Sequence, residues 1–207
     1  MPERLTVPID PSQQVIGYSV NSNLPEELYA PIQGIQAGLK EKFSDAIWAV
    51  PRESLHITLM DWLVQDAHYG REEDELFHDI KSNYIYALTD ILKHQEPIQI
   101  TFDKIEVYPA AIIVKGHDDG SYQRIREEFL QRVKLLPGTK TPPKIIHTTI
   151  CKFLKQIDAT EVEDFVKNEA LAVQGDITEF WLARESLAFM GNYDVLQRFP
   201  LLPETHK

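Results

Sequence analysis

Short segments of alternating apolar and polar residues recur along the chain, and such alternation is typical of strands that bury one face. Residues 98–102 show it most clearly. Strands are predicted at residues 15–20, 48–50, 54–63, 98–102, 111–115, 144–153, 177–183, 186–190 and 193–199. The last two are expected to form a hairpin around Gly191 and Asn192.

Between these strands, apolar residues recur every three or four positions and predict helices. The helices cover about residues 25–42, 71–94, 122–135 and 160–171. Pro25 and the two glutamates after it are typical of a first helical turn, because the helix dipole favours acidic side chains there. Thr160 and Glu163 have the spacing of a capping box at the start of the last helix.

Each half of the chain has the order strand, helix, strand, and Tyr18 precedes His56 by about as many residues as Ile113 precedes His147. Two similar lobes facing each other across a cleft would have this order. A parallel doubly wound sheet is the other possibility, but no glycine-rich phosphate loop follows any predicted strand. Residues 1–13 contain three prolines and no periodicity, so we expect an extended N-terminal arm there.

The composition is that of a globular protein, with 207 residues, of which 43% are hydrophobic and 26% charged. No apolar run approaches the length of a membrane helix, and the first residues lack the pattern of a signal peptide. Cys151 is the single cysteine, so an intrachain disulfide is excluded and a reducing compartment is expected. We therefore predict a soluble cytoplasmic protein that does not bind membranes.

The formal net charge of −11 limits the choice of partners. A chain this acidic repels polyanions, so we do not expect it to bind long nucleic acids. A small phosphorylated ligand or the end of a short oligonucleotide is compatible with this charge if basic residues gather locally. The candidates for such a group are Arg52, Lys104, Lys144 and Lys152.

Two His-x-Thr steps, His56 to Thr58 and His147 to Thr149, lie in strand-like apolar runs. Residues i and i+2 of a strand point to the same face, so each step places an imidazole beside a hydroxyl. If the two strands meet, two imidazoles and two hydroxyls line one cleft. That set suits in-line chemistry at a phosphate, with a base, an acid and donors for the phosphate oxygens.

The pair of motifs, His56-Ile57-Thr58-Leu59 and His147-Thr148-Thr149-Ile150, resembles the signature of the two-histidine (2H) phosphoesterase superfamily. This superfamily includes the LigT-like 2′-5′ RNA ligases and the 2′,3′-cyclic nucleotide phosphodiesterases. The resemblance implies an α+β fold of two pseudo-symmetric lobes, each an antiparallel sheet flanked by helices, around a central cleft. It also implies that residues 1–207 form a single domain of two lobes.

The same resemblance implies what the site residues do. His56 and His147 would be the acid–base pair, and Thr58 and Thr149 would bind the phosphate, without a metal or another cofactor. The substrate would carry a 2′,3′-cyclic phosphate or a 2′-5′ phosphodiester on a nucleotide or a short RNA end. We expect the protein to act as a monomer, and the sequence leaves open which histidine is the acid.

Two other functions are compatible with these residues. A metal hydrolase would need further ligands, and Asp61 should face away from His56 on a regular strand. A non-catalytic module that binds nucleotides would keep the fold without turnover.

Met60 and Cys151 are expected to form the cleft floor. Four aromatic residues could stack on a base or belong to the core: Tyr18, Trp62, Phe102 and Tyr108.

Overall fold

Two antiparallel sheets form the centre of the molecule in a computed structural model that describes residues 4–5, 10–65 and 67–202. The first sheet has the order β11-β10-β2-β4, and the second has the order β3-β7-β6-β5-β9. The strands of the first are β2 (Gln14–Ser22), β4 (Ile57–Leu63), β10 (Glu179–Leu187) and β11 (Asn192–Pro200). Those of the second are β3 (Ile47–Ala49), β5 (Ile98–Tyr108), β6 (Ala111–His117), β7 (Ile146–Phe153) and β9 (Val173–Ile177).

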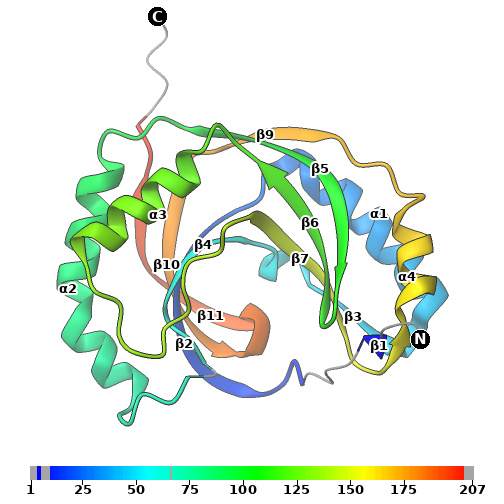
Figure 1. The fold of residues 1–207 in the computed structure, drawn as a ribbon, viewed down its shortest axis with the longest axis horizontal. Coiled ribbons are helices and arrows are strands. Elements are labelled where there is room, and N and C mark those ends of the chain that lie inside the picture. Colours follow the sequence, from blue (N-terminus) through cyan, green and yellow to red (C-terminus); the bar gives the residue numbers. More distant parts are fainter. Residues whose placement is uncertain (1–3, 6–9, 66, 203–207) are drawn as a thin grey trace, which may run out of the picture.

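Helices cover the outer side of each sheet, α2 and α3 on one side of the molecule and α1 and α4 on the other (Figure 1). These are α1 (Glu26–Phe43), α2 (Glu73–Leu92), α3 (Ser121–Arg132) and α4 (Ala159–Val166). Short 3-10 turns are η1 (Ser44–Ala46), η2 (Arg52–Ser54) and η3 (Ala188–Met190). This arrangement confirms the predicted α+β fold with two lobes, and the parallel doubly wound alternative was wrong because the paired strands run antiparallel.

The predicted repeat of elements is present in the pairing of the strands. β2 and β4 are antiparallel neighbours joined through α1, and β6 and β7 are antiparallel neighbours joined through α3. In both units the helix packs on the opposite lobe, since α1 contacts β3, β7 and β9 while α3 contacts β4. The two lobes are thereby interlocked, and β4 and β7 lie against each other where they meet.

Buried aromatic side chains hold the first motif strand in place. Trp62 of β4 is fully buried, with its ring stacked on Phe129 of α3 at 6.1 Å and edge-on to Tyr84 of α2 at 5.2 Å. The Gln36 amide of α1 donates to the carbonyls of Val50 and Ile150, both at 2.8 Å, and so joins the end of β3 to β7. Rigid packing of both motif strands is what a precisely positioned site requires.

Several predicted element bounds were wrong. The segment 177–183 is not one strand, because the chain leaves β9 of the second sheet at Ile177 and enters β10 of the first sheet at Glu179. Residues 186–190 end as the turn η3, so the hairpin partner of β11 is β10. The N-cap of α4 is Asp158, whose carboxylate accepts from the Thr160 amide at 2.8 Å, two residues before the expected capping box.

The predicted N-terminal arm lies only partly within the described residues. Residues 4–5 form β1 (Arg4–Leu5), which pairs with β8 (Ile157–Asp158), while residues 1–3 and 6–9 lie outside the described part. None of the helices in the described residues combines the length and the apolar composition needed to cross a bilayer.

Candidate active site

The four motif residues line one cleft of about 440 Å³ between the two sheets. His56 and Thr58 reach it from the first lobe, and His147 and Thr149 from the second. All four side chains are partly exposed, while the residues between them, Ile57 and Thr148, are buried. The structure thus brings together the residues that sequence reasoning selected, and their chemical roles stay a prediction.

Each motif strand contains an irregularity at the same step of its motif. Across β2 and β4, Asn21 pairs with Thr58 and Val20 with Met60, so Leu59 is an extra residue in β4. The β6–β7 ladder has the same irregularity directly after the second motif threonine, which leaves Ile150 as the extra residue of β7. An extra residue of this kind is a β-bulge, and it reverses the faces of the residues that follow.

The bulges correct three predictions. Asp61 and Lys152, each five residues after a motif histidine, line the cleft together with the threonines. Asp61 was expected on the opposite face, which would hold only for a regular strand. Met60 and Cys151 were expected as the cleft floor, but both are fully buried away from it. Burial raises the pKa of the Cys151 thiol to about 12, so this thiol is a poor nucleophile.

A hydrogen bond to the backbone orients the His56 ring. Its Nδ1 lies 2.7 Å from the Ser54 carbonyl oxygen, which can only accept, so Nδ1 carries the proton of the neutral ring. Nε2 is then the nitrogen free of a proton, which suits it to act as a base. The Trp181 ring packs against the His56 ring at a centroid distance of 6.4 Å, with the two ring planes inclined by 64°. Burial lowers the pKa of His56, and the charge of Lys152 adds to this effect.

The pKa of His147 is lowered further, to about 4. Burial is the main cause, and His56, Arg126 and Lys152 each add a smaller contribution of the same sign. A hydrogen bond with the backbone of Ile145, two residues earlier, acts in the opposite direction. Both imidazoles are therefore held neutral at pH 7 in the free protein, which is the form that can accept a proton.

Arg126 supports the bulge of the first motif strand from α3. Its side chain is buried, with Nε donating to the Leu59 carbonyl at 2.7 Å and Nη2 to the Thr58 carbonyl at 2.9 Å. Burial lowers its pKa to about 10, so the guanidinium remains charged at neutral pH. Sequence reasoning missed Arg126, because nothing in its helix distinguishes it from a solvated arginine.

Of the basic residues proposed as a local group, Lys152 lines the cleft. Arg52 instead pairs with Glu26 at 2.6 Å, Lys104 pairs with Glu106 at 2.5 Å, and Lys144 is exposed outside the cleft lining. The cleft also contains Lys140, Asp61 and Glu185. Its charged lining is therefore mixed in sign.

Four aromatic residues were expected either to stack on a base or to belong to the core. Trp62 and Phe102 belong to the core. Tyr108 is exposed, and it lies outside the cleft lining. Tyr18 does line the cleft, but its ring is stacked on Phe77 at 3.9 Å. Phe189 of η3 also lines the cleft with its aromatic ring. Sequence reasoning missed this residue because it assigned residues 186–190 to a strand.

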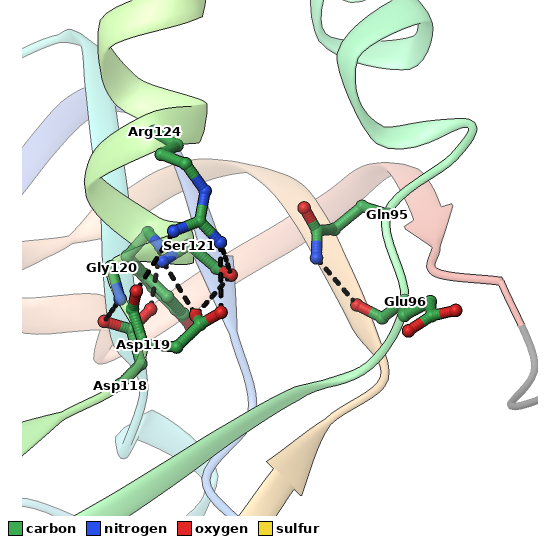
Figure 2. Close-up of polar contacts among 8 residues, drawn as sticks. Gln95, Glu96, Asp118, Asp119, Gly120, Ser121 and Arg124 are labelled. Carbon is green, nitrogen blue, oxygen red and sulfur yellow. Dashed lines mark hydrogen bonds and ion pairs between the residues drawn. The ribbon is translucent and has the colours of Figure 1, made fainter.

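A second hollow, of about 590 Å³, is lined by residues at the start of α3 and by none of the four motif residues. Figure 2 shows the polar contacts of this region. Its carboxylates cap the helix, since Asp118 accepts from the amides of Gly120 at 2.9 Å and Tyr122 at 2.8 Å. Arg124 pairs with Asp119 at 3.1 Å. These groups satisfy one another as a helix cap does, and they form no second catalytic set.

The described residues contain no group of three or more His, Cys, Asp or Glu side chains arranged to hold a metal ion. Asp61 and Glu185 line the same cleft as the two histidines, but these four side chains do not come together as a group that could hold a metal ion, and zinc needs three or four protein ligands around one point.

Comparisons with known proteins agree with this fold. The TT0787 protein of Thermus thermophilus has a similar structure, with a TM-score of 0.64 and 19% identity over 91% of this chain and 99% of that one. LigT of Escherichia coli is similar in its complex with phosphate (TM-score 0.56, 15% identity) and in its complex with 3′-AMP (TM-score 0.53, 16% identity). Both LigT structures match over 91% of this chain and 99% of LigT.

No curated protein sequence matches the chain significantly. At identities below 20%, the structural likenesses show the fold alone. Residues 24–187, which contain both His-x-Thr motifs, match the family described as the 2′-5′ RNA ligase superfamily. The chain therefore belongs to the 2′-5′ RNA ligase superfamily.

Proposed function

We propose that the protein is a metal-independent phosphoesterase that opens a 2′,3′-cyclic phosphate or cleaves a 2′-5′ phosphodiester on a nucleotide or a short RNA end. The observation that carries the proposal is the meeting of His56, Thr58, His147 and Thr149 in one cleft. Family membership supports a phosphoesterase or ligase-like activity. We further propose that the protein acts as a cytoplasmic monomer.

The chemistry needs one proton acceptor and one proton donor on opposite sides of the phosphorus. One imidazole removes a proton from water, and the water oxygen forms a bond to phosphorus. The bond from phosphorus to a ribose oxygen breaks, and the second imidazole, in its protonated form, gives its proton to that oxygen. Proton transfer of this kind is worth about 10²–10⁴-fold in rate for each group.

Thr58 and Thr149 would donate to the non-bridging oxygens and hold the phosphorus in line. In the free protein both imidazoles are neutral, so the second ring must gain its proton when the anionic phosphate binds. A nearby anion favours the charged form of an imidazole, and the substrate itself would thus prepare the acid. The same site could also join ends if a ribose hydroxyl takes the place of water. One imidazole would then remove the hydroxyl proton, the hydroxyl oxygen would bond to the phosphorus of a cyclic phosphate, and the ribose oxygen that leaves would take the proton of the second imidazole.

The complexes of E. coli LigT with phosphate and with 3′-AMP support this substrate class, since both ligands are a phosphate or a phosphorylated nucleoside. The cleft volume of about 440 Å³ also suits a mononucleotide or the end of a short chain.

The test is a substrate panel of nucleoside 2′,3′-cyclic phosphates and 2′-5′ and 3′-5′ dinucleotides, assayed with the wild type, His56→Gln and His147→Gln. We expect turnover of at least one cyclic phosphate or 2′-5′ linkage, loss of at least 100-fold in each variant, and full activity in the presence of a chelator. His78→Gln is the matched control, because His78 is exposed on α2.

Three results would contradict the proposal. Activity that a chelator removes and zinc or manganese restores would show that the enzyme needs a metal. Tight binding of a 2′-phosphate without turnover of any substrate on the panel would favour a non-catalytic nucleotide-binding module. Turnover that survives in both histidine variants would place the chemistry elsewhere.

A further inference from the structure

The turn η3 (Ala188–Met190) crosses from the first lobe to the second at the cleft. It follows β10 of the first sheet, yet the Phe189 ring contacts two residues of the second sheet. Its centroid lies 6.1 Å from that of Trp48 in β3 and 4.4 Å from the Lys152 ammonium in β7. Phe189 therefore lies beside the second motif strand, in the lining of the cleft.

The backbone of this turn is in a conformation that side chains disfavour. Phe189 and Met190 both have positive φ, at 60° and 59°. Residues with a β-carbon rarely adopt this region, and such strain persists only where the surrounding structure enforces it. Two consecutive residues of this kind suggest that the orientation of the Phe189 ring is important enough to outweigh the strain.

Hydrogen bonds on both sides of Met190 enforce the conformation. Its amide donates to Glu185 Oε1 at 2.6 Å, and its carbonyl accepts from Ser54 Oγ at 2.8 Å. Ser54 is also the residue whose carbonyl accepts from His56 Nδ1. The Met190 side chain is buried with Trp181, the residue that packs against His56. The turn is thus fastened to the supports of the first motif histidine.

Phe189 is placed differently from the other aromatic rings near the site. The Tyr18 ring is stacked on Phe77, and its hydroxyl donates to Asp74, which also forms two hydrogen bonds with Arg184 at 2.7 and 2.8 Å. By contrast, Phe189 remains partly exposed, and its contact with the Trp48 ring is tilted by 50° rather than stacked. The Lys152 ammonium lies over one face of the ring, so a planar ligand would use the opposite face. A partly exposed apolar ring at the edge of a polar cleft is a stacking surface for a planar ligand.

We propose that Phe189 is the platform on which the nucleobase of the substrate stacks while its phosphate lies between the two histidines. The proposal rests on the proposed function, and it adds the part of the site that recognises the base. Stacking on an aromatic ring tolerates every base, because each base has a π-face. The platform would therefore favour nucleotides over base-free sugar phosphates and distinguish little among the four bases.

The test compares a nucleoside 2′,3′-cyclic phosphate with methyl ribofuranoside 2′,3′-cyclic phosphate, which has a methoxy group in place of the base. For Phe189→Leu we expect a loss of about 10-fold or more in kcat/KM on the nucleotide, mainly through KM, and a change within about 2-fold on the base-free substrate. Phe189→Tyr should retain both activities. Tyr86→Leu removes an exposed ring on α2 and is the matched control.

Equal losses on both substrates in Phe189→Leu, or no loss on either, would overturn the platform. Calorimetry with 2′-AMP and with inorganic phosphate separates this outcome from failure of the proposed function. If the wild type binds 2′-AMP more tightly than phosphate and Phe189→Leu removes the difference, the platform is supported even without turnover. If the wild type binds both equally, the platform is refuted whether or not the protein is an enzyme.

Discussion

Binding of an anion in the cleft should raise the pKa of His147 by several units. In the free protein this pKa is about 4, which corresponds to about 3 kcal/mol in favour of the neutral ring. One negative charge at about 4 Å contributes about 4 kcal/mol at an effective dielectric constant of 20, or about 3 pKa units. An anion bound beside the ring is therefore expected to raise the pKa to about 7.

The measurement is a histidine titration by NMR with ring-labelled protein between about pH 4 and 9, with and without saturating sulfate. Sulfate is chosen because its charge is constant over this range, so that only the protein titrates. His56→Gln and His147→Gln assign the two cleft signals. We expect the pKa of at least one of the two cleft histidines to rise by about 2–3 units when sulfate is bound.

The same coupling requires sulfate to bind more tightly as the pH falls from 8 to 5, because binding takes up a proton. If calorimetry shows that sulfate is bound and neither cleft pKa moves by more than about half a unit, the anion does not prepare the acid. Free-protein values near 6.5 for both rings would also refute the reasoning, since burial would then not hold them neutral.

Two further predictions concern stability. Because the folded-state pKa of His147 is lowered to about 4, the unfolded chain takes up a proton below about pH 6.5 that the folded protein does not, so stability is lost as the pH falls from 6.5 to 4. Urea unfolding at pH 7 and 4.5 should show that His147→Gln loses about 2–3 kcal/mol less than the wild type; equal losses would refute this. Arg126→Met should destabilise the protein by about 1–3 kcal/mol at pH 7, since two carbonyls of β4 lose their donors; unchanged urea unfolding would show that the bulge needs no such support.

The four motif residues could be predicted from the sequence because their relation is local. A step of two residues in a strand places His56 with Thr58, and His147 with Thr149, whatever the rest of the fold. The likeness of the two halves then suggested that the strands meet, and β4 and β7 do lie against each other.

The rest of the cleft lining could not be predicted because it depends on contacts between distant segments. Arg126 comes from α3 of the second half and packs on β4 of the first. Phe189 looks like a strand residue in the sequence, and the turn that presents it is held by Ser54 and Glu185. No local propensity predicts positive φ at a phenylalanine followed by a methionine.

The bulges explain how two nearly identical motifs can act in an asymmetric reaction. Leu59 and Ile150 are extra residues at equivalent steps, so Asp61 and Lys152 enter the cleft at equivalent places with opposite charge. The pseudo-symmetry of the fold brings the two imidazoles into one cleft, while the side chains five residues further on make their surroundings differ. A reaction with one acid and one base needs such a difference, because two equivalent rings would compete for the same proton.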